Sequence, residues 1–432
     1  AGRLWCGYAC PQTVWTEVFL WMERWVEGDR NKQIKLDKAP WSAEKVRKKA
    51  TKQFLWVTFA LWTGFTFVGF FTPIKELGAS VLRIRALGGD GGDELSLEPA
   101  NDNARPDAFD WSRFPIGETE AKNAVVIKAA QQRGVETIVA VAWSPPGWMK
   151  DSGNMCGGRL LPQYFEVAAR YYARAIQDYY KLGIPIYAMT LQNEPLMVHR
   201  RYPTCYMSWE EQSHLLKLLK TELVRLNLDT QLWIFDHNFN QAMYYPASIQ
   251  KDPQAYAALD GVAFHSYEGR VEQMGELHTA YPEVDLYFTE RSTFGVRGID
   301  EILQYFRHGA KSYNAWVTCL DDRQQPNAGP HHCSPTFLTV SRSDPNDVWP
   351  IAEYHLLGQI SKFVRRGARL VESDYGSARK VTSAAFLNPD GTLAVVVVNQ
   401  TKREQRFALG LPRDSIHTSL SGKSVATYLW PA

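Results

Sequence analysis

The chain of 432 residues carries 48 Lys and Arg against 46 Asp and Glu, and its hydrophobic fraction of 45% is typical of a globular protein. A net charge of +2 gives no sign of nucleic-acid binding, and six cysteines over this length exclude a disulfide-stapled scaffold. The basic excess lies in residues 1–77, with 12 Lys and Arg against 7 Asp and Glu, whereas the remainder carries 36 against 39.

A charge-free run extends from Gln53 to Ile74. At about 1.5 Å per residue, a helix of this length measures about 30 Å, the thickness of a hydrocarbon core. Basic residues between Lys45 and Lys52 precede the run, and by the positive-inside rule they place the N-terminus in the cytoplasm. We expect residues 53–74 to form a transmembrane helix, with 1–52 cytoplasmic and the rest periplasmic or extracellular. A buried helix of a soluble protein is the alternative.

Cys6 and Cys10 form a C-x3-C-P arrangement upstream of this run. Two thiols cannot complete a four-cysteine iron–sulfur site, and an inert pair is the simpler reading of them. The sequence around the two cysteines is more specific, because residues 2–77 resemble an internal stretch of the cytochrome c oxidase accessory proteins, which are membrane polyferredoxins. The ferredoxin-type cysteine runs of that family are absent here, so the resemblance does not extend to a redox centre.

From Gly78 onward, β-rich apolar runs alternate with helical patterns, which is typical of a parallel α/β sheet. The predicted strands are 81–86, 137–143, 186–192, 231–237, 261–267, 285–290 and 314–321. A helix is predicted over 162–183, because its apolar and aromatic residues recur at helical spacing. After about residue 358 the pattern changes to strands around an Asn-Pro-Asp-Gly turn. These patterns predict a barrel over 78–357 and a small antiparallel β-domain over 358–432.

Two glutamates lie where predicted strands end. Asn193 and Glu194 follow one strand, and Glu290 ends another three strands later. Active sites of (β/α)8 barrels form at the C-terminal ends of the strands. A pair of carboxylates there is what glycoside hydrolysis needs, since one protonates the leaving oxygen and the other attacks the anomeric carbon. Either glutamate alone could equally bind water or cap a helix.

The longer sequence motifs around these residues are specific when they are taken together. They are "VAWSPPGWMK" (141–150), "GIPIYAMTLQNEP" (183–195), "GVAFHSYEG" (261–269), "YFTERST" (287–293) and "WVTCLDDRQQPNAGPHHCSP" (316–335). Together they resemble glycoside hydrolase family 30, which includes glucosylceramidases and related β-glycosidases. The resemblance covers residues 78–432 and implies a (β/α)8-type TIM barrel with a β-sandwich side domain.

The resemblance also implies roles for single residues. Glu194 matches the general acid/base and Glu290 the nucleophile of a retaining mechanism, which expects carboxyl groups about 5–5.5 Å apart and a raised pKa for Glu194. Asn193 would contact the sugar 2-hydroxyl. The remaining implied substrate contacts are Trp143, His265, Tyr267, Trp316 and Asp321. Each has a structural alternative: barrel packing for the tryptophans, a satisfied core histidine, and a solvated loop carboxylate. No metal or other cofactor is required, and Cys6 with Cys10 is the remaining metal candidate.

The chain departs from the family's pattern in one respect. The family's first strand and helix have no counterpart before Gly78, so seven barrel strands are expected instead of eight. Two unpaired sheet edges would then remain, which costs stability. The leading hypothesis is a membrane-anchored retaining β-glycosidase acting on a β-linked glucoside or glycolipid. The alternatives are a membrane redox or cytochrome oxidase assembly fragment, or a fusion with an inactive barrel. Cys156 and Cys205 could pair if the barrel is extracytoplasmic.

Overall fold

The protein divides into two compact units, residues 1–71 and residues 72–432. The computed structural model describes the parts of the chain that follow here: 21–56, 77–87, 118–325, 334, 337–344, 347–411 and 414–431. Cys6, Cys10 and residues 57–74 of the predicted membrane span lie outside these described residues. No helix in the described ranges is both long and apolar enough to cross a bilayer.

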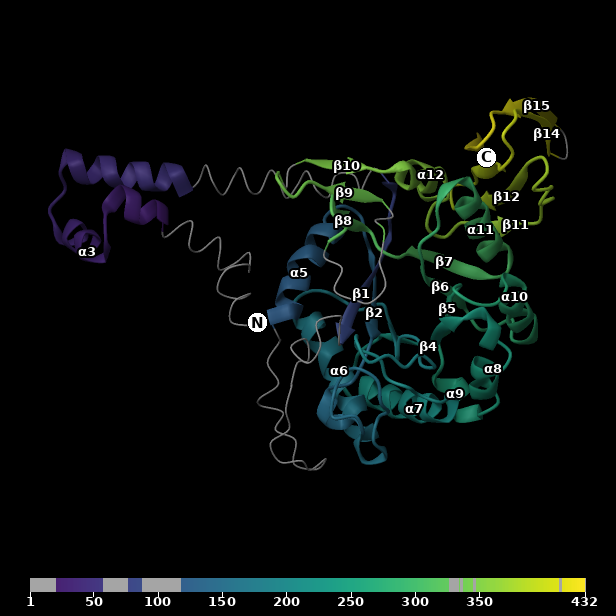
Figure 1. Ribbon diagram of the computed structural model, residues 1–432, viewed down its shortest axis with the longest axis horizontal. Helices are drawn as coiled ribbons and strands as arrows, with labels where there is room; N and C mark the ends of the chain where they lie inside the picture. The colour runs from purple at the N-terminus through teal and green to yellow at the C-terminus, as the bar shows by residue number, and fades with distance from the viewer. Residues whose placement is uncertain are drawn as a thin grey trace. The chain divides into compact units, whose positions relative to one another are not determined.

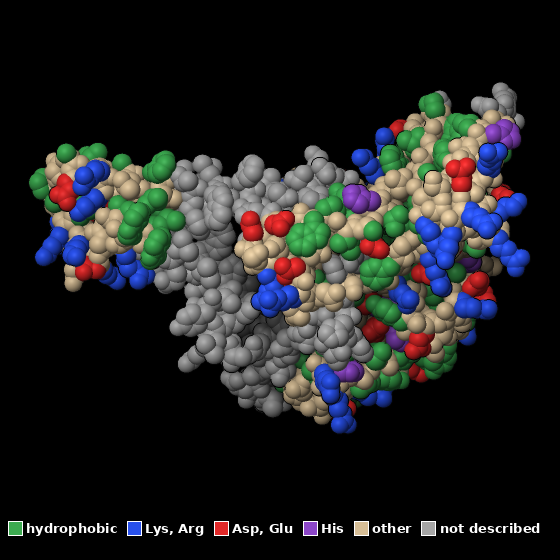
Figure 2. All heavy atoms as spheres, turned by 45° about the horizontal axis from the view of Figure 1, so that its top comes forward, with side chains coloured by type: hydrophobic (Ala, Val, Ile, Leu, Met, Phe, Trp, Pro, Cys, Tyr) green, Lys and Arg blue, Asp and Glu red, His purple; other side chains and the backbone are tan. Residues whose placement is uncertain are grey.

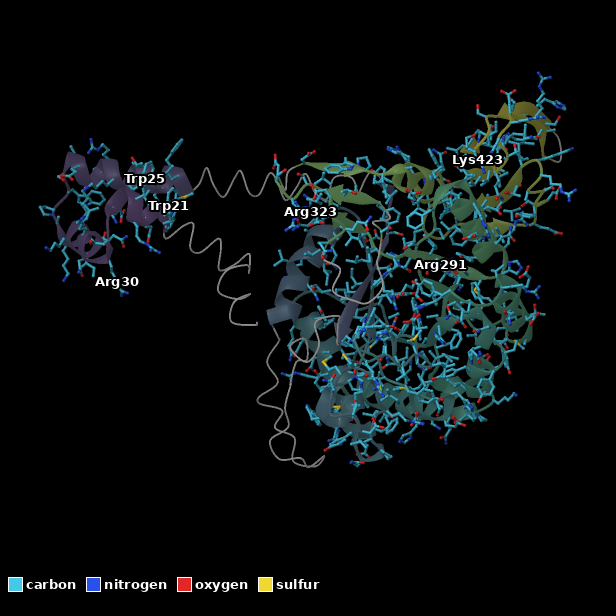
Figure 3. The ribbon with its side chains drawn as sticks, viewed as in Figure 1. Trp21, Trp25, Arg30, Arg291, Arg323 and Lys423 are labelled. Atoms are coloured by element: carbon cyan, nitrogen blue, oxygen red, sulfur yellow. The ribbon has the colours of Figure 1, made fainter. Side chains whose placement is uncertain are left out.

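The N-terminal unit contains helical residues 21–27 and 43–56 on either side of α3 (Arg30–Lys38). Asp29 begins α3 as its N-cap, accepting a hydrogen bond from the Lys32 backbone N–H. Glu27 is buried and its carboxylate lies 3.0 Å from Lys49 Nζ, which joins the helical residues 21–27 to the helical residues 43–56. The rings of Trp21 and Trp25 are exposed and stack on each other (Figure 3). Hydrophobic and basic side chains are both exposed on this unit (Figure 2).

The larger unit is built on a parallel sheet of seven strands in sequential order (Figure 1). The strands are β1 (Val81–Leu87), β2 (Thr137–Ala142), β3 (Ala188–Thr190), β4 (Gln231–Asn238), β5 (Gly261–His265), β6 (Leu286–Arg291) and β7 (Ala310–Ala315). Helices follow the strands on the outside of the sheet: α5 (Glu118–Gln131), α6 (Phe165–Lys181), α7 (Trp209–Arg225), α8 (Tyr245–Gln250), α9 (Pro253–Ala258), α10 (Val271–Ala280) and α11 (Gly295–Arg307). The predicted TIM-barrel class is confirmed, and the sheet is nearly closed.

The two ends of the sheet, β1 and β7, approach each other, and no ladder joins them in the described part of the chain. The prediction of seven strands is therefore confirmed for these residues. The prediction of a strand over 314–321 is wrong in its position, because β7 ends at Ala315. Residues Cys319–Asp321 form β8, which pairs with β9 (Leu338–Val340) in a separate small sheet that β10 (Val348–Pro350) completes.

Large aromatic side chains fill the barrel interior near the start of the strands. The Trp233 and Tyr287 rings stack with centroids 3.7 Å apart, and both pack against Val139, Ala188 and Ala263. Small residues on β2, β3 and β5 thus make room for two large ones on β4 and β6, which lets the layers interdigitate at interior packing density. This packed layer leaves the opposite end of the barrel for polar side chains.

The segment before β1 is built into the barrel. Leu77 is buried against Phe337, Leu338 and Tyr354, and its carbonyl accepts a hydrogen bond from the Ser361 hydroxyl. Gly78 follows with a φ of 75°, and a Cβ there would lie 2.5 Å from the Ser361 carbonyl oxygen. Only glycine fits this close approach, so Leu77 and Gly78 pack as part of the larger unit.

The C-terminal β-domain is confirmed as predicted. α12 (Ala352–Ser361) leads into a sheet ordered β11 (Arg369–Val371), β12 (Thr382–Leu387), β13 (Leu393–Asn399) and β16 (Ser424–Trp430), and β14 (Gln405–Leu411) pairs with β15 (Asp414–Leu420). The β12–β13 turn contains the expected Asn388-Pro389-Asp390-Gly391 sequence. Val395, Val397 and Leu420 lie in the core between these strands.

Candidate active site

A buried carboxylate, Asp236 on β4, occupies the centre of a polar cluster inside the barrel. It is 0% exposed, and four side chains surround its two oxygens. Arg83 and Thr190 donate to Oδ2, each over 2.7 Å, while Thr289 donates to Oδ1 and His265 Nε2 lies 3.0 Å from Oδ1. A buried charge is tolerated only when it is paired and hydrogen-bonded, and Asp236 meets both conditions.

Arg83, on β1, links this centre to Glu290 and to Asn193, the neighbour of Glu194. Its Nη1 donates to Oε2 of Glu290 and its Nη2 donates to Oδ1 of Asn193, each over 2.7 Å. Burial alone would lower the pKa of Arg83, but the charges of Asp236 and Glu290 outweigh burial and raise it. The guanidinium is therefore a permanent cation whose planar fork fixes three groups at once.

Glu194 lies beyond the C-terminal end of β3, in a backbone that continues to bond with both neighbouring strands. The Asn193 N–H donates to the Ala142 carbonyl over 2.7 Å, and the Glu194 N–H donates to the Asp236 carbonyl over 3.0 Å. Glu194 has a φ of 46°, a left-handed conformation that is unfavourable for a non-glycine residue. Strain of this kind is retained where the surrounding structure fixes it, commonly at functional sites.

Glu290 is 5% exposed and accepts two hydrogen bonds, one on each oxygen. Arg83 donates to Oε2, and the Tyr267 hydroxyl donates to Oε1 over 2.9 Å. Tyr267 is 44% exposed as a residue, and its ring lies 5.3 Å from the guanidinium of Arg291, which ends β6. Glu290 is thus held as a hydrogen-bond acceptor beside the open mouth of the barrel.

The two glutamates lie close together. An oxygen of Glu194, a ring nitrogen of His265 and an oxygen of Glu290 all lie within 4.8 Å of one another. Retaining glycosidases hold their carboxyl groups ~5–5.5 Å apart and inverting ones ~6.5–9.5 Å apart to leave room for a water, so closely placed oxygens are what a retaining site requires. The donor atoms a metal would use are already engaged by Arg83, Tyr267 and Asp236. The expectation that no metal is required stays a prediction.

The pKa of Glu194 is shifted in the direction opposite to the one predicted from the sequence. Burial would raise the pKa of Glu194, but the hydrogen bond and positive charge of His265 outweigh it, so that pKa is lowered. The prediction of a raised pKa is therefore wrong for the unliganded protein. Burial would likewise lower the pKa of His265, but the charges of Glu290 and Asp236 raise it to about 10. For Asp236, burial is outweighed by Arg83 and His265, and its pKa lies far below the usual range.

Aromatic side chains gather at the C-terminal end of the barrel. The Trp143 and Trp316 rings stack with centroids 5.6 Å apart, and Tyr202 meets Trp143 edge-on at 5.9 Å. Trp143 follows β2 and Trp316 follows β7, so both lie at the C-terminal end of the barrel. The backbone of Trp143 is tied to the Glu194 segment, since Gln192 Nε2 donates to its carbonyl over 2.8 Å.

Two of the predicted substrate contacts lie among protein partners, and their contact with a substrate stays a prediction. His265 is 0% exposed, and its imidazole contacts Asp236 and Glu194. Oδ1 of Asp321 accepts from the backbone N–H groups of Arg323 and Gln325 in its own turn, and Oδ2 lies 3.4 Å from Nε of Arg342. Neither Cys156 nor Cys205 forms a disulfide, so that pairing is wrong. Asn193, Glu194, Tyr267 and Glu290, in contrast, are brought into one connected cluster.

Sequence reasoning missed Arg83 and Asp236. Both stand inside predicted strands, "VLRIRA" and "QLWIFDH", where a charge interrupts an apolar run. A charge within a buried strand needs a partner of opposite sign, so these two interruptions were a usable signal. Their pairing could not be read from the sequence, because 153 positions separate them.

Comparison with known proteins gives consistent matches to the two parts of the larger unit. Residues 96–322 match the glycosyl hydrolase family 30 TIM-barrel domain, and residues 367–428 match the family's beta sandwich domain. Endo-1,6-beta-D-glucanase BGN16.3 of Trichoderma harzianum is 28% identical over 369 residues, 76% of this chain and 74% of that protein. The lysosomal acid glucosylceramidase of Mus musculus is 24% identical over 357 residues, 75% of this chain and 69% of that protein.

A solved structure and an N-terminal match complete the comparison. The endo-beta1,6-glucanase BT3312 superimposes with a TM-score of 0.73 at 27% identity, covering 84% of this chain and 85% of that one. The protein RdxB of Cereibacter sphaeroides is 54% identical over 82 residues, 19% of this chain and 17% of that protein. The predicted resemblance to cytochrome oxidase accessory proteins at the N-terminus is thereby confirmed.

Proposed function

The chain belongs to glycosyl hydrolase family 30, and from this membership we propose that it is a retaining β-glycosidase with Glu290 as nucleophile and Glu194 as acid/base. The observation that carries the proposal is the approach of one oxygen of each glutamate to within 4.8 Å. At this distance Glu290 can attack the anomeric carbon while Glu194 protonates the leaving oxygen on the same bond. Arg83 and Tyr267 hold both oxygens of Glu290, which pre-organises it for attack.

We propose a β-linked glucan as the substrate, with β-1,6 linkage as the first choice. BGN16.3 and BT3312, whose names both specify this linkage, support the choice. Tyr267, exposed as a residue, and the partly buried Trp316, on which the buried Trp143 stacks, carry aromatic rings of the kind on which sugar rings pack. Asn193 is held by Arg83 with its side-chain oxygen occupied, so its amide N–H groups remain to donate to a sugar hydroxyl.

The test compares wild type with Glu290→Gln and Glu194→Gln on an aryl β-glucoside and on β-1,6-glucan. Glu290→Gln should lose activity on every substrate, because no covalent intermediate can form. Glu194→Gln should lose activity mainly with poor leaving groups, and added azide should restore turnover because this anion needs no general base. Equal rates for wild type and Glu290→Gln would overturn the assignment. Glucosylceramide serves as the comparison substrate, and preferential cleavage of it would replace the glucan as substrate class.

We also propose that residues 53–74 anchor the hydrolase in a membrane. The charge-free composition of this run, the basic residues before it and the exposed Trp21 and Trp25 support the proposal. The measurement is alkaline carbonate extraction of membranes from cells that express the full chain. A spanning segment keeps the protein in the pellet, whereas complete release into the supernatant would overturn the proposal.

A further inference from the structure

Both ring nitrogens of His265 are engaged by carboxylates, and this restricts where protons can lie. Nε2 lies 3.0 Å from Oδ1 of Asp236, and Nδ1 lies 3.3 Å from Oε1 of Glu194. Asp236 already accepts from Arg83, Thr190 and Thr289. It is therefore an acceptor only, so Nε2 of His265 must carry its hydrogen.

Two proton positions are then compatible with the contact between Nδ1 of His265 and Oε1 of Glu194. Either Nδ1 of His265 carries a proton and donates to the Glu194 carboxylate, or a protonated Glu194 donates to a bare Nδ1. The two arrangements contain the same number of protons. They differ only in the position of one proton along a single hydrogen bond, and that proton is the one a general acid at Glu194 needs.

We propose that His265 and Glu194 hold the catalytic proton jointly, with the proton resting on Nδ1 of His265 in the unliganded protein and passing to Oε1 of Glu194 for delivery to the leaving group. His265 is thus a positioning residue that acts through Glu194. The inference rests on the proposed retaining mechanism. It adds a second residue that holds the catalytic proton, which the retaining mechanism itself does not require.

The charges around His265 favour this resting position. Asp236 faces it from β4, Glu194 from the segment after β3, and Glu290 from β6, where Oε2 lies 3.9 Å from Nε2. Arg83 on β1 is the cation that pairs with two of these carboxylates, and His237 on β4 is kept neutral because burial lowers its pKa to about 4. A second cation at His265 offsets part of the remaining negative charge, in agreement with its raised pKa and the lowered pKa of Glu194.

The reaction itself supplies a reason for the proton to leave His265. As an oxygen of Glu290 bonds to the anomeric carbon, the negative charge next to the imidazolium disappears and the imidazolium becomes a stronger acid. The proton then moves from Nδ1 to Glu194 and on to the glycosidic oxygen, which keeps the electron pair of the broken carbon–oxygen bond. In the second step Glu194 takes a proton from water, the water oxygen bonds to the anomeric carbon, and Glu290 leaves as a carboxylate. The restored charge draws the proton back to His265.

The experiment measures kcat/KM of the full chain for two aryl β-glucosides. Phenyl β-glucoside needs a proton on its leaving group, and 2,4-dinitrophenyl β-glucoside does not. His265→Gln keeps hydrogen-bonding capacity but cannot store the proton. It should therefore lower kcat/KM by about a hundredfold or more on the phenyl substrate and by less than about tenfold on the dinitrophenyl substrate. His308→Gln, a histidine before β7 at the opposite end of the barrel, is the matched control and should change neither value.

The pH profile gives a readout that a purely structural role would not move. In wild type the alkaline limb of kcat/KM reports loss of the proton from the His265–Glu194 pair. In His265→Gln, Glu194 must hold that proton alone, and a carboxyl group releases it at lower pH. The alkaline limb should therefore shift to lower pH by at least about one unit. Equal losses on both substrates together with an unmoved limb would overturn the proposal, even if Glu290→Gln is inactive as expected.

A second measurement needs no variant. In the wild-type chain labelled with 15N-histidine, NMR at neutral pH should show both ring nitrogens of His265 protonated, and a covalent 2-fluoroglycosyl adduct on Glu290 should shift Nδ1 toward the unprotonated form. A neutral His265 in the unliganded protein would contradict the proposed resting position. An imidazolium unaffected by the adduct would contradict the coupling.

Discussion

Nη1 of Arg83 lies 2.7 Å from Oε2 of Glu290, although the two residues are 207 positions apart. The first strand of the sheet therefore fixes the candidate nucleophile on the sixth, across the centre of the barrel. The same guanidinium binds Asp236 and Asn193, so one side chain on β1 orients groups from β4, β6 and the end of β3. This contact shows how a barrel of seven strands still assembles a connected site.

Arg83→Lys should lower kcat/KM by about a hundredfold or more, because an ammonium group cannot hold three acceptors in the geometry of a guanidinium. Arg83→Met should in addition lower the free energy of unfolding by about 3–5 kcal/mol, because it leaves Asp236 without its permanent cation. Kinetics on an aryl β-glucoside and urea denaturation check the two effects. Arg297→Met, at an exposed helical position paired with Glu301, is the control and should change neither. Unaltered kinetics in Arg83→Lys would show that the contact does not position Glu290.

The buried His265 and Asp236 make stability depend on pH in two ranges. The neighbouring carboxylates raise the pKa of His265 to about 10, against about 6.5 for an unfolded histidine. The contribution of His265 to the free energy of unfolding is therefore complete below about pH 6.5 and is lost as the pH rises to about 10. Asp236 has a lowered pKa, so its contribution is present above about pH 4 and is lost as the pH falls further. Melting temperatures from pH 3 to 10 measure both. The difference in melting temperature between wild type and His265→Gln should shrink from pH 6.5 to 10, and a constant difference would contradict this account.

Lys150 joins two loops at the mouth of the barrel. Its buried Nζ donates to the Ser144 hydroxyl and to the carbonyls of Met155 and Thr204, over 2.7–2.9 Å. Lys150→Met should therefore cost about 2–3 kcal/mol of stability, because it leaves buried acceptors unsatisfied. It should also raise KM more than it changes kcat, since the loops next to Trp143 and Glu194 loosen.

Lys217→Met is the matched control for this prediction. Lys217 forms an ion pair with Asp252 over 2.7 Å, but both side chains are about a third exposed, so its loss should cost less than about 1 kcal/mol. Denaturation curves of the two variants give the comparison. Equal costs would show that the loops do not depend on the buried ammonium group.

Gly78 tests whether the segment before β1 is part of the hydrolase fold. Gly78→Ala combines a positive φ with a clash against the Ser361 carbonyl, whereas Gly183→Ala has a similar φ of 76° and nothing within 4 Å of the new Cβ. Gly183→Ala should cost about 1 kcal/mol, and Gly78→Ala at least about 1 kcal/mol more. Melting temperatures of the two variants measure this. A smaller loss at Gly78 would mean that Leu77 and Gly78 do not pack as described.

Sequence patterns were sufficient for the architecture because parallel strands and their helices leave local signals. The barrel strands, the helix over 162–183 and the β12–β13 turn all follow from hydrophobic period and turn residues. The strand at 314–321 was misplaced because the β-rich residues of β8, after Trp316, look like a continuation of β7. These residues pair with β9 because of tertiary contacts, and local β propensity does not show which strand a segment will pair with.

The active-site glutamates could be predicted because strand ends are recognisable in a sequence. The charged partners could not, since Arg83, Asp236 and His265 acquire their roles only when distant strands meet. For the same reason the pKa of Glu194 was predicted in the wrong direction. A neighbouring carboxylate was anticipated, but not the imidazolium that hydrogen-bonds Glu194.

The central claim is that Glu290 forms a covalent bond to the sugar. Incubation of the full chain with a 2-deoxy-2-fluoro-β-glucosyl fluoride, followed by proteolysis and mass spectrometry, tests it most directly. The account predicts inactivation with one fluoroglucosyl group on the peptide that contains Glu290, and no label in Glu290→Gln. Label on Glu194, or hydrolysis of glycosides with no labelling at all, would contradict it.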